Sequence, residues 1–307
     1  MMGKPLVDVI IPVYRPDDSF RQLLSRLRNQ TIPPRKIILM ITEEEHGERP
    51  EFPDEPDTEC HYLSKREFDH GNTRNQGVSF SDADYVLLMT QDAMPDNDRM
   101  IETLLEAFSE ERVASSYARQ LPREDCREIE AFTRSFSYPE VSTIKLQKDL
   151  ERLGIRTYFC SNVCAMYDRR IMEKLGGFTR HTIFNEDMIY AYEVIRAGYS
   201  IAYCANARVI HSHNYSGRQQ LHRNFDLAVS QADHPEIFSA VSSEKEGIGL
   251  VKKTIRHLFS VGKWYSVPYL FYQSGMKYAG YFLGKRYKKL PQRLVRRLSM
   301  NKNYWEE

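Results

Sequence analysis

Short apolar runs alternate with segments of helical spacing in the first part of the chain, and this alternation limits the possible folds more than any other feature. Three runs of strand length occur at residues 6–11, 36–41 and 85–89. A helix opened by Asp17 or Asp18 separates the first two, and a helix over residues 73–80 leads into the third. This β-α-β-α-β opening predicts an α/β fold with a mainly parallel central sheet and helices on both faces.

Later segments extend the pattern. We expect strands at residues 113–117, 160–167, 200–205 and 207–210, and helices at residues 98–108, 168–175 and 188–197. Residues 43–59, rich in proline and glutamate, are expected to form a loop.

The charge distribution divides the chain. It has 307 residues, with 43 Lys and Arg and 42 Asp and Glu, yet no acid lies between Glu246 and Glu306. That stretch holds 13 of the basic residues, so the remainder carries 30 basic and 42 acidic residues, a balance of −12. We therefore predict a catalytic domain over residues 1–245 and a basic, aromatic-rich helical extension over residues 246–307.

The C-terminal extension is expected to contain helices at residues 250–261, 264–283 and 290–298. The middle segment is apolar, but Gln273 and Lys277 interrupt it, which argues against a membrane span. Aromatic and basic helices without acids suit the surface of an anionic membrane. The alternative is packing against the catalytic domain or another subunit, as in a homo-oligomer. We expect no nucleic-acid partner, because no recognised binding module accompanies the charge.

The cysteines and the N-terminus indicate the compartment. The five cysteines are odd in number and form no C-x-x-C pair, which predicts reduced thiols and no zinc site. Residues 1–5 lead directly into a strand and leave no room for a secretory signal. We therefore expect a cytoplasmic protein, associated peripherally with the inner face of the cell membrane through its extension.

Two groups of carboxylates suggest the chemistry. Asp92 follows the buried run Tyr85–Met89, and ligands bind at the carboxyl ends of strands in open α/β sheets. Glu186 and Asp187 are adjacent acids at the start of a predicted helix. One acid that holds a metal and one that takes a proton are the minimum for moving a group from a diphosphate to a hydroxyl. The alternatives are a turn or N-cap role for Asp92 and acids that favour the helix dipole.

Several motifs together resemble a known family. They are VIIPVY at residues 9–14, FDHGNTRNQG at 68–77, TQDA at 90–93, NED at 185–187 and HSHNY at 211–215. The chain resembles the inverting family-2 glycosyltransferases of GT-A fold, and it is similar to their bacterial rhamnosyltransferase branch over about residues 5–235. It departs from the family at Asn72, where a second glycine is usual, and at residues 42–44, where an Asp-x-Ser segment is expected.

The resemblance implies roles for particular residues. Asp92 would hold Mg²⁺ or Mn²⁺ against the diphosphate, with His211 or His213 completing the metal site. Asp187 would be the general base, and Glu186 would orient or bind the acceptor. The donor-binding residues would be Pro12, Tyr14, Asp69, His70, Gly71, Arg74, Asn75 and Gln91. The alternatives are a surface turn in which Arg74 pairs with Asp69, and a pair of surface histidines.

These features predict an inverting glycosyltransferase. The resemblance implies transfer of L-rhamnose from dTDP-L-rhamnose to a hydroxyl of a bacterial cell-surface polysaccharide or a lipid-linked glycan. One alternative is transfer of another hexose or an N-acetylhexosamine from a UDP-sugar. Another is a non-catalytic protein that binds a sugar nucleotide or a glycan.

Overall fold

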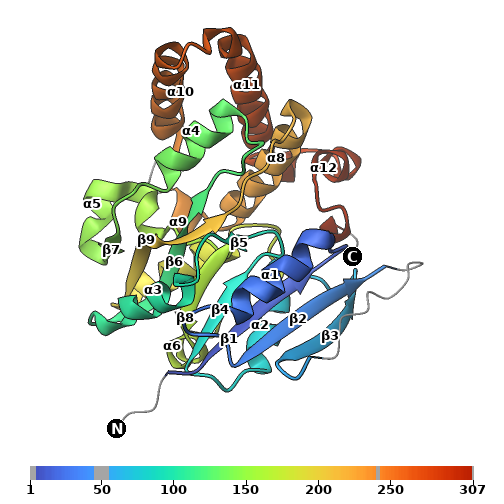
Figure 1. The fold of residues 1–307 in the computed structure, drawn as a ribbon. Helices are drawn as coiled ribbons and strands as arrows, with labels where there is room; N and C mark the ends of the chain where they lie inside the picture. Colours follow the sequence, from blue (N-terminus) through green and yellow to red (C-terminus); the bar gives the residue numbers. More distant parts are fainter. Residues whose placement is uncertain (1–4, 45–54, 240–242, 306–307) are drawn as a thin grey trace. The chain divides into compact units, whose positions relative to one another are not determined.

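The computed structural model describes residues 5–44, 55–239 and 243–305 (Figure 1). The chain forms two compact units. The first, here called the sheet unit, comprises Met1–Leu121, Tyr138–His181 and Glu186–His211. The second, the helical unit, comprises Pro122–Ser137, Thr182–Asn185 and Ser212–Glu307. Most of the loop predicted at residues 43–59 lies outside the described residues.

The sheet unit is built on one nine-stranded sheet. Its strands are β1 (Val7–Val13), β2 (Lys36–Glu43), β3 (Thr58–Ser64), β4 (Tyr85–Met89), β5 (Met94–Pro95), β6 (Val113–Leu121), β7 (Thr143–Lys145), β8 (Cys164–Asp168) and β9 (Ser200–Ile210). Their order is β3-β2-β1-β4-β8-β6-β9-β5, and β7 also pairs with β9. The predicted α/β class is confirmed.

The parallel arrangement holds for part of the sheet. Strands β3, β2, β1 and β4 are parallel, whereas β8 runs antiparallel to both β4 and β6. Because β8 is reversed, its first residue, Cys164, pairs with Met89 at the end of β4. The segment that enters β8 therefore lies at the carboxyl ends of the parallel strands.

Helices cover both faces of this sheet, as predicted. They are α1 (Asp18–Arg28), α2 (His70–Ser79), α3 (Met100–Glu106), α5 (Leu150–Leu153), α6 (Arg169–Lys174) and α7 (Glu186–Arg196), with short 3-10 helices at Ala107–Ser109, Gln147–Asp149 and Gly154–Tyr158. Side chains alternate along β1, so Val9 and Ile11 share a core with Leu23 of α1, drawn in front of the sheet in Figure 1. On the other face, a Cβ on Gly77 of α2 would lie 2.4 Å from Ile10 Cγ2.

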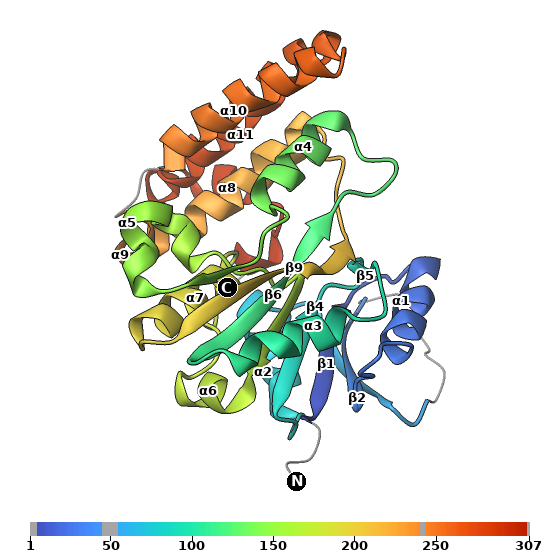
Figure 2. The ribbon, with the colours of Figure 1, turned by 60° about the vertical axis from the view of Figure 1, so that its left-hand side comes forward.

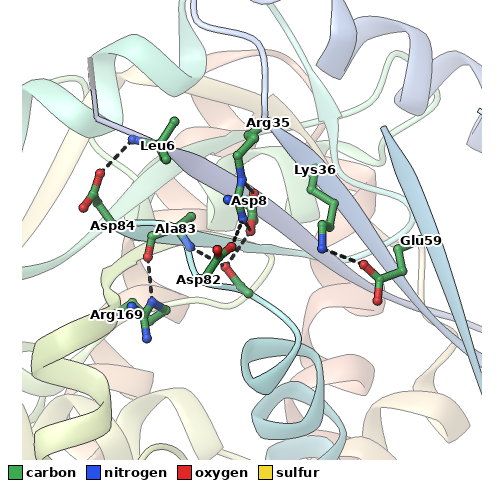
Figure 3. Close-up of polar contacts among 10 residues, drawn as sticks. Leu6, Asp8, Arg35, Lys36, Glu59, Asp82, Ala83, Asp84 and Arg169 are labelled. Carbon is green, nitrogen blue, oxygen red and sulfur yellow. Dashed lines mark hydrogen bonds and ion pairs between the residues drawn. The ribbon is translucent and has the colours of Figure 1, made fainter. Parts of the chain in front are cut away.

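A polar cluster joins the amino ends of β1, β2 and β4 (Figure 3). Asp8 is fully buried, and the Arg35 guanidinium donates two hydrogen bonds to it, at 2.9 and 2.6 Å. Ser81 Oγ donates a third at 2.6 Å, and Arg35 also pairs with the exposed Asp82. We call Asp8, Arg35, Ser81 and Asp82 the amino-end cluster. Each Asp8 oxygen accepts a strong hydrogen bond, so the cluster holds the amino ends of these three strands together.

The helical unit contains α4 (Glu128–Ser137), α8 (Gly217–Asp233), α9 (Pro235–Phe238), α10 (Ser243–Ser260), α11 (Val267–Gly284) and α12 (Gln292–Leu298), with short 3-10 helices at Trp264–Ser266, Tyr287–Lys289 and Asn303–Trp305. Figure 2 shows α8 alongside α11, and two glycines allow this approach. A Cβ on Gly280 would lie 2.1 Å from Leu221 O, and one on Gly284 would lie 2.3 Å from Phe225 O. The predicted C-terminal helices are present. Among the described residues, no helix is both long and apolar enough to span a bilayer.

Three local predictions differ from the structure. Strand β3 falls partly in the predicted loop; it alternates polar and apolar residues at the sheet edge and so lacks a buried apolar run. The strand predicted at residues 160–167 begins only at Cys164. Residues 200–210 form one strand instead of two. The predicted domain boundary near residue 245 falls near the start of α10, inside the helical unit, and the division into catalytic domain and extension stays a prediction.

Candidate active site

Two loops meet at the carboxyl ends of β1 and β4. The backbone N–H of Tyr14 donates to Gln91 Oε1 at 2.7 Å, and Gln91 Nε2 donates to the Tyr14 carbonyl at 2.9 Å. Pro12 pairs with β2 only, because the β1–β4 pairing ends at Ile10, so its missing N–H removes no hydrogen bond to β4. The structure thus brings together three of the residues predicted to bind a donor.

Cations surround the ring of Tyr14. The Arg15 guanidinium carbon lies 5.3 Å from its centroid, and Lys65 Nζ lies 5.8 Å from it. Arg15 also pairs with Glu44, a residue of the segment where the family's Asp-x-Ser was expected. An aromatic ring beside two cations is suited to a planar, anionic ligand.

Asp92 and His211 lie side by side, as the metal prediction requires. His211 Nε2 is 3.4 Å from Asp92 Oδ2. The pairing of β5 with β9 explains this: Met94 is opposite Ile210, so the turn that contains Asp92 reaches the residue after β9. Asp92 caps no helix, because α3 begins only at Met100. His213, two residues further on, belongs to the helical unit, where its ring stacks on Tyr215.

The buried Gln120 faces Nδ1 of His211. Gln120 Nε2 donates to Tyr138 Oη at 2.6 Å and to Ser161 Oγ at 3.0 Å. Its Oε1 lies 3.1 Å from His211 Nδ1. With a proton on Nδ1, donated to this oxygen, a neutral His211 has its lone pair on Nε2, the nitrogen nearest Asp92. A histidine oriented through its other nitrogen is the usual form of a metal ligand.

Glu186 and Asp187 occupy the first turn of α7 and have different partners. Arg74 Nη1 lies 3.2 Å from Glu186 Oε1, which also accepts a hydrogen bond from Asn162 Nδ2 at 3.2 Å. Asp187 accepts from the backbone N–H groups of Asn162, at 3.2 Å, and Met188, at 2.8 Å. Among these contacts the cation is closest to Glu186, and backbone dipoles hold Asp187.

These different partners shift the pKa values of the two acids in opposite directions. Burial would raise the pKa of Glu186, but Arg74, His70 and Asn162 outweigh it and hold that pKa below its usual value. Burial and the neighbouring Glu186 charge raise the pKa of Asp187, and its backbone hydrogen bonds only partly offset them. Asp187 therefore binds a proton more readily than an ordinary aspartate, as a general base requires.

The segment Ser161–Val163 connects these groups. Ser161 accepts from the amide that orients His211, Asn162 donates to both acids, and the Val163 carbonyl accepts from Thr90 N–H, at 3.2 Å, two residues before Asp92. The backbone of these residues serves the site, which explains why β8 starts later than predicted. Tyr167 Oη donates to Asn162 Oδ1 at 2.7 Å and fixes its amide.

The residues of the loop predicted to face the donor mostly contact other residues of the protein. Asp69 Oδ1 caps α2 by accepting from Gly71 and Asn72 N–H. A Cβ on Gly71 would lie 1.9 Å from Thr179 O, so glycine is needed for packing. Asn75 makes two hydrogen bonds to the backbone of Phe178, at 2.8 and 2.9 Å.

Arg74 pairs with Glu186 and donates to the His70 carbonyl at 2.7 Å, so a surface turn in which it pairs with Asp69 is wrong. Sequence reasoning missed Gln120, Ser161, Asn162 and Tyr167. These residues act through hydrogen bonds to the site and belong to no short motif.

Comparison with known protein families and curated proteins gives consistent matches. The family model described as "Glycosyl transferase family 2" matches residues 8–176. The O-antigen chain rhamnosyltransferase RfbN of Salmonella typhimurium is 36% identical over 303 residues, which cover 97% of this chain and 96% of that protein. The O-antigen chain rhamnosyltransferase WbaN of Salmonella anatum is 36% identical over 306 residues, with coverage of 98% and 96%.

Solved structures share the fold at low sequence identity. The mannosyltransferase PcManGT from Pyrobaculum calidifontis, in complex with GDP-Man and Mn²⁺, aligns with a TM-score of 0.56 and 14% identity, over 99% of this chain and 86% of that chain. TarS 1-349 of S. aureus aligns with a TM-score of 0.52 and 13% identity, over 92% of this chain and 91% of that chain.

Proposed function

Because this chain belongs to glycosyl transferase family 2 and has its GT-A fold, we propose that it transfers L-rhamnose from dTDP-L-rhamnose to a hydroxyl of a cell-surface polysaccharide or its lipid-linked intermediate. The choice of sugar rests on the two rhamnosyltransferases, which match this chain over nearly its whole length. Solved structures in complex with GDP-Man or UDP-GlcNAc are only 14% identical, so another hexose or an N-acetylhexosamine is the weaker candidate.

The observation that carries the catalytic proposal is the unequal environment of the two acids. Asp187, whose pKa is raised, takes the proton of the acceptor hydroxyl as its oxygen attacks the anomeric carbon. The bond between that carbon and the diphosphate oxygen breaks on the opposite face, so the configuration inverts. Glu186 stays ionised beside Arg74 and orients the acceptor. A protein that only binds glycans would have no need of such a base.

We propose Asp92 and His211 as ligands of Mg²⁺ or Mn²⁺, and His213, two residues further along the chain, as a further candidate ligand. A divalent ion bound there would neutralise the charge of the departing nucleoside diphosphate. The carboxylate–imidazole pair, with Gln120 Oε1 beside the other nitrogen of the histidine, fits this role.

Donor contacts are proposed for Pro12, Tyr14, His70 and Gln91. The internal hydrogen bonds of Asp69, Arg74 and Asn75 suggest that these residues, with Gly71, shape the loop that faces the donor. We further propose that the protein works at the cytoplasmic face of the membrane, where a lipid-linked acceptor is presented, and that residues 246–307 contact the membrane surface. Self-association through the same residues is the alternative.

A donor panel tests the proposal. The purified full chain is incubated with dTDP-L-rhamnose, UDP-glucose, UDP-N-acetylglucosamine and GDP-mannose, with Mn²⁺ or with EDTA, and nucleotide release is measured. We expect dTDP-L-rhamnose to be turned over fastest, only with the metal, and to give product of inverted configuration by NMR. Preference for a UDP-sugar would contradict the rhamnosyl assignment, and retained configuration would contradict the base. Asp187→Asn is the matched inactive control.

A further inference from the structure

Helix α11 presents an aromatic stripe to solvent. Phe271, Tyr278 and Phe282 are 57%, 58% and 42% exposed. Spacings of seven and four residues place them on one side of the helix. The other side of α11 packs on α8 through Gly280 and Gly284. We call these three residues the aromatic stripe.

A cavity of about 570 Å³ lies at the C-terminal end of this stripe. The residues lining it include Tyr278, Phe282, Lys285, Arg286, Lys288 and Lys289. Two members of the aromatic stripe thus form part of its wall, beside four cationic side chains. The cavity therefore joins an apolar surface to a concentration of positive charge.

Most of this positive charge is uncompensated. Lys288 pairs with Asp233 at 2.9 Å, and Tyr287 Oη also donates to that carboxylate at 2.6 Å. In the part of the chain that the structure describes, Lys285, Arg286 and Lys289 have no carboxylate within ion-pair distance. The Arg286 guanidinium lies 3.7 Å from the centroid of Phe282 and donates to the Phe282 carbonyl.

Lys285 and Lys289 are thus the side chains most available for an anion. Within the described residues, the one hydrogen bond that Lys285 donates is long, 3.4 Å, to the Gln231 carbonyl. Its partial burial lowers its pKa, a cost that a bound anion would offset. Residues 247–305 contain no acid that could repel such a ligand.

We propose that this cavity binds the phosphate or diphosphate of a lipid, and that the hydrocarbon chain of that lipid lies along the aromatic stripe. A free phosphate would satisfy the lysines but would leave the exposed aromatic residues in water. A lipid phosphate satisfies both features with one ligand. This inference rests on the proposed function, since a lipid-linked acceptor carries such a group, and it places the carrier's phosphate at the end of α11.

Vesicle binding tests the site. Full-length protein is mixed with phosphatidylcholine vesicles that contain either phosphatidic acid, which has a terminal phosphate, or enough phosphatidylglycerol to give the same surface charge. We expect about tenfold tighter binding to the phosphatidic acid vesicles, and we expect inorganic pyrophosphate to compete. The double variant Lys285→Gln/Lys289→Gln should lose this preference.

The matched control is Lys252→Gln/Lys302→Gln, which removes the same charge from the same extension but lies outside the cavity. It should weaken binding to both kinds of vesicle equally and keep the preference, because general attraction to an anionic surface depends on charge alone. Equal behaviour of the two double variants, no preference in the wild type, or no competition by pyrophosphate would overturn the proposal.

Two further measurements distinguish a lipid site from a subunit interface and from an error in the proposed function. Light scattering that showed the lysines or the aromatic stripe to be needed for self-association would assign the surface to a second copy of the chain and overturn the lipid site. Nucleoside diphosphate affinity and transfer to a soluble acceptor should be unchanged in Lys285→Gln/Lys289→Gln. If the wild type neither bound the nucleoside diphosphate nor transferred sugar to a soluble acceptor, that result would count against the proposed function and not against this cavity.

Discussion

Buried carboxylates have different partners at the two ends of the central sheet. At the amino ends of the strands, Asp8 receives two hydrogen bonds from Arg35 and one from Ser81. At the carboxyl ends, Arg74 is paired with Glu186, and Asp187 keeps two backbone hydrogen bonds beside a second negative charge. One buried acid is neutralised by a cation, whereas the other has a raised pKa.

The difference shows how the same residue type can serve stability or catalysis. An acid that accepts hydrogen bonds from its own cation holds strands together. When the cation is paired with a neighbouring acid instead, burial and the neighbour's charge raise the pKa of the unpaired acid. The partner of the arginine, and not the burial of the acid, separates the two roles.

The largest expected effect is on the catalytic side of this comparison. Asp187→Asn should reduce transfer by roughly 10³-fold, because the acceptor proton loses its base. Affinity for the nucleoside diphosphate should change by only a few-fold, since the donor is held elsewhere. A transfer assay and calorimetry measure the two quantities, and equal losses in both would make Asp187 a structural or donor-site residue.

Asp8→Ala should affect stability instead. It removes the partner of Arg35 and Ser81 in a buried setting, and we expect a loss of about 3 kcal/mol in the free energy of unfolding. Activity per folded molecule should be retained. Denaturant titration provides the measurement, with Asp82→Ala as the control, because the Asp82 side chain is 82% exposed and its loss should cost far less stability. A catalytic defect in folded Asp8→Ala would break the comparison.

Asp92→Asn probes a third carboxylate, at the same end of the sheet as Asp187. If Asp92 and His211 hold the metal, the variant should keep its fold and lose about 10²-fold in metal-dependent turnover, or ~2.7 kcal/mol. Chelation of the wild type with EDTA should have the same effect. Full activity in either experiment would contradict the metal site.

Much of the sheet unit could be predicted from the sequence. The runs that became β1, β2 and β4 are buried on both faces and therefore read as continuous apolar segments. Strand β3 was not recognised, because a partly exposed edge strand needs polar residues on one side. The reversal of β8 was also missed, since the direction of a strand depends on its partners and leaves no local pattern.

The candidate site could likewise be predicted only in part from the sequence. Asp92, His211, Glu186 and Asp187 lie at strand ends or a helix start, where position in the pattern indicates function. Gln120 and Asn162 orient these groups, yet each is a single polar residue in an apolar context. Their importance depends on which atoms they face in the fold. Arg74 was expected at the donor, and its pairing with Glu186 emerged only from the packing of α2 and α7.

The pH dependence of transfer by Glu186→Gln tests the central claim most directly. In the wild type, kcat/KM should rise with pH as Asp187 loses its proton, at a pH above the usual range of an aspartate. The Glu186 charge contributes to that elevation, so its removal, with Arg74 retained, should lower the pKa of Asp187 and move the acidic limb to lower pH. We expect this downward shift even if the maximal rate falls. An acidic limb that stays in place or moves to higher pH would contradict it.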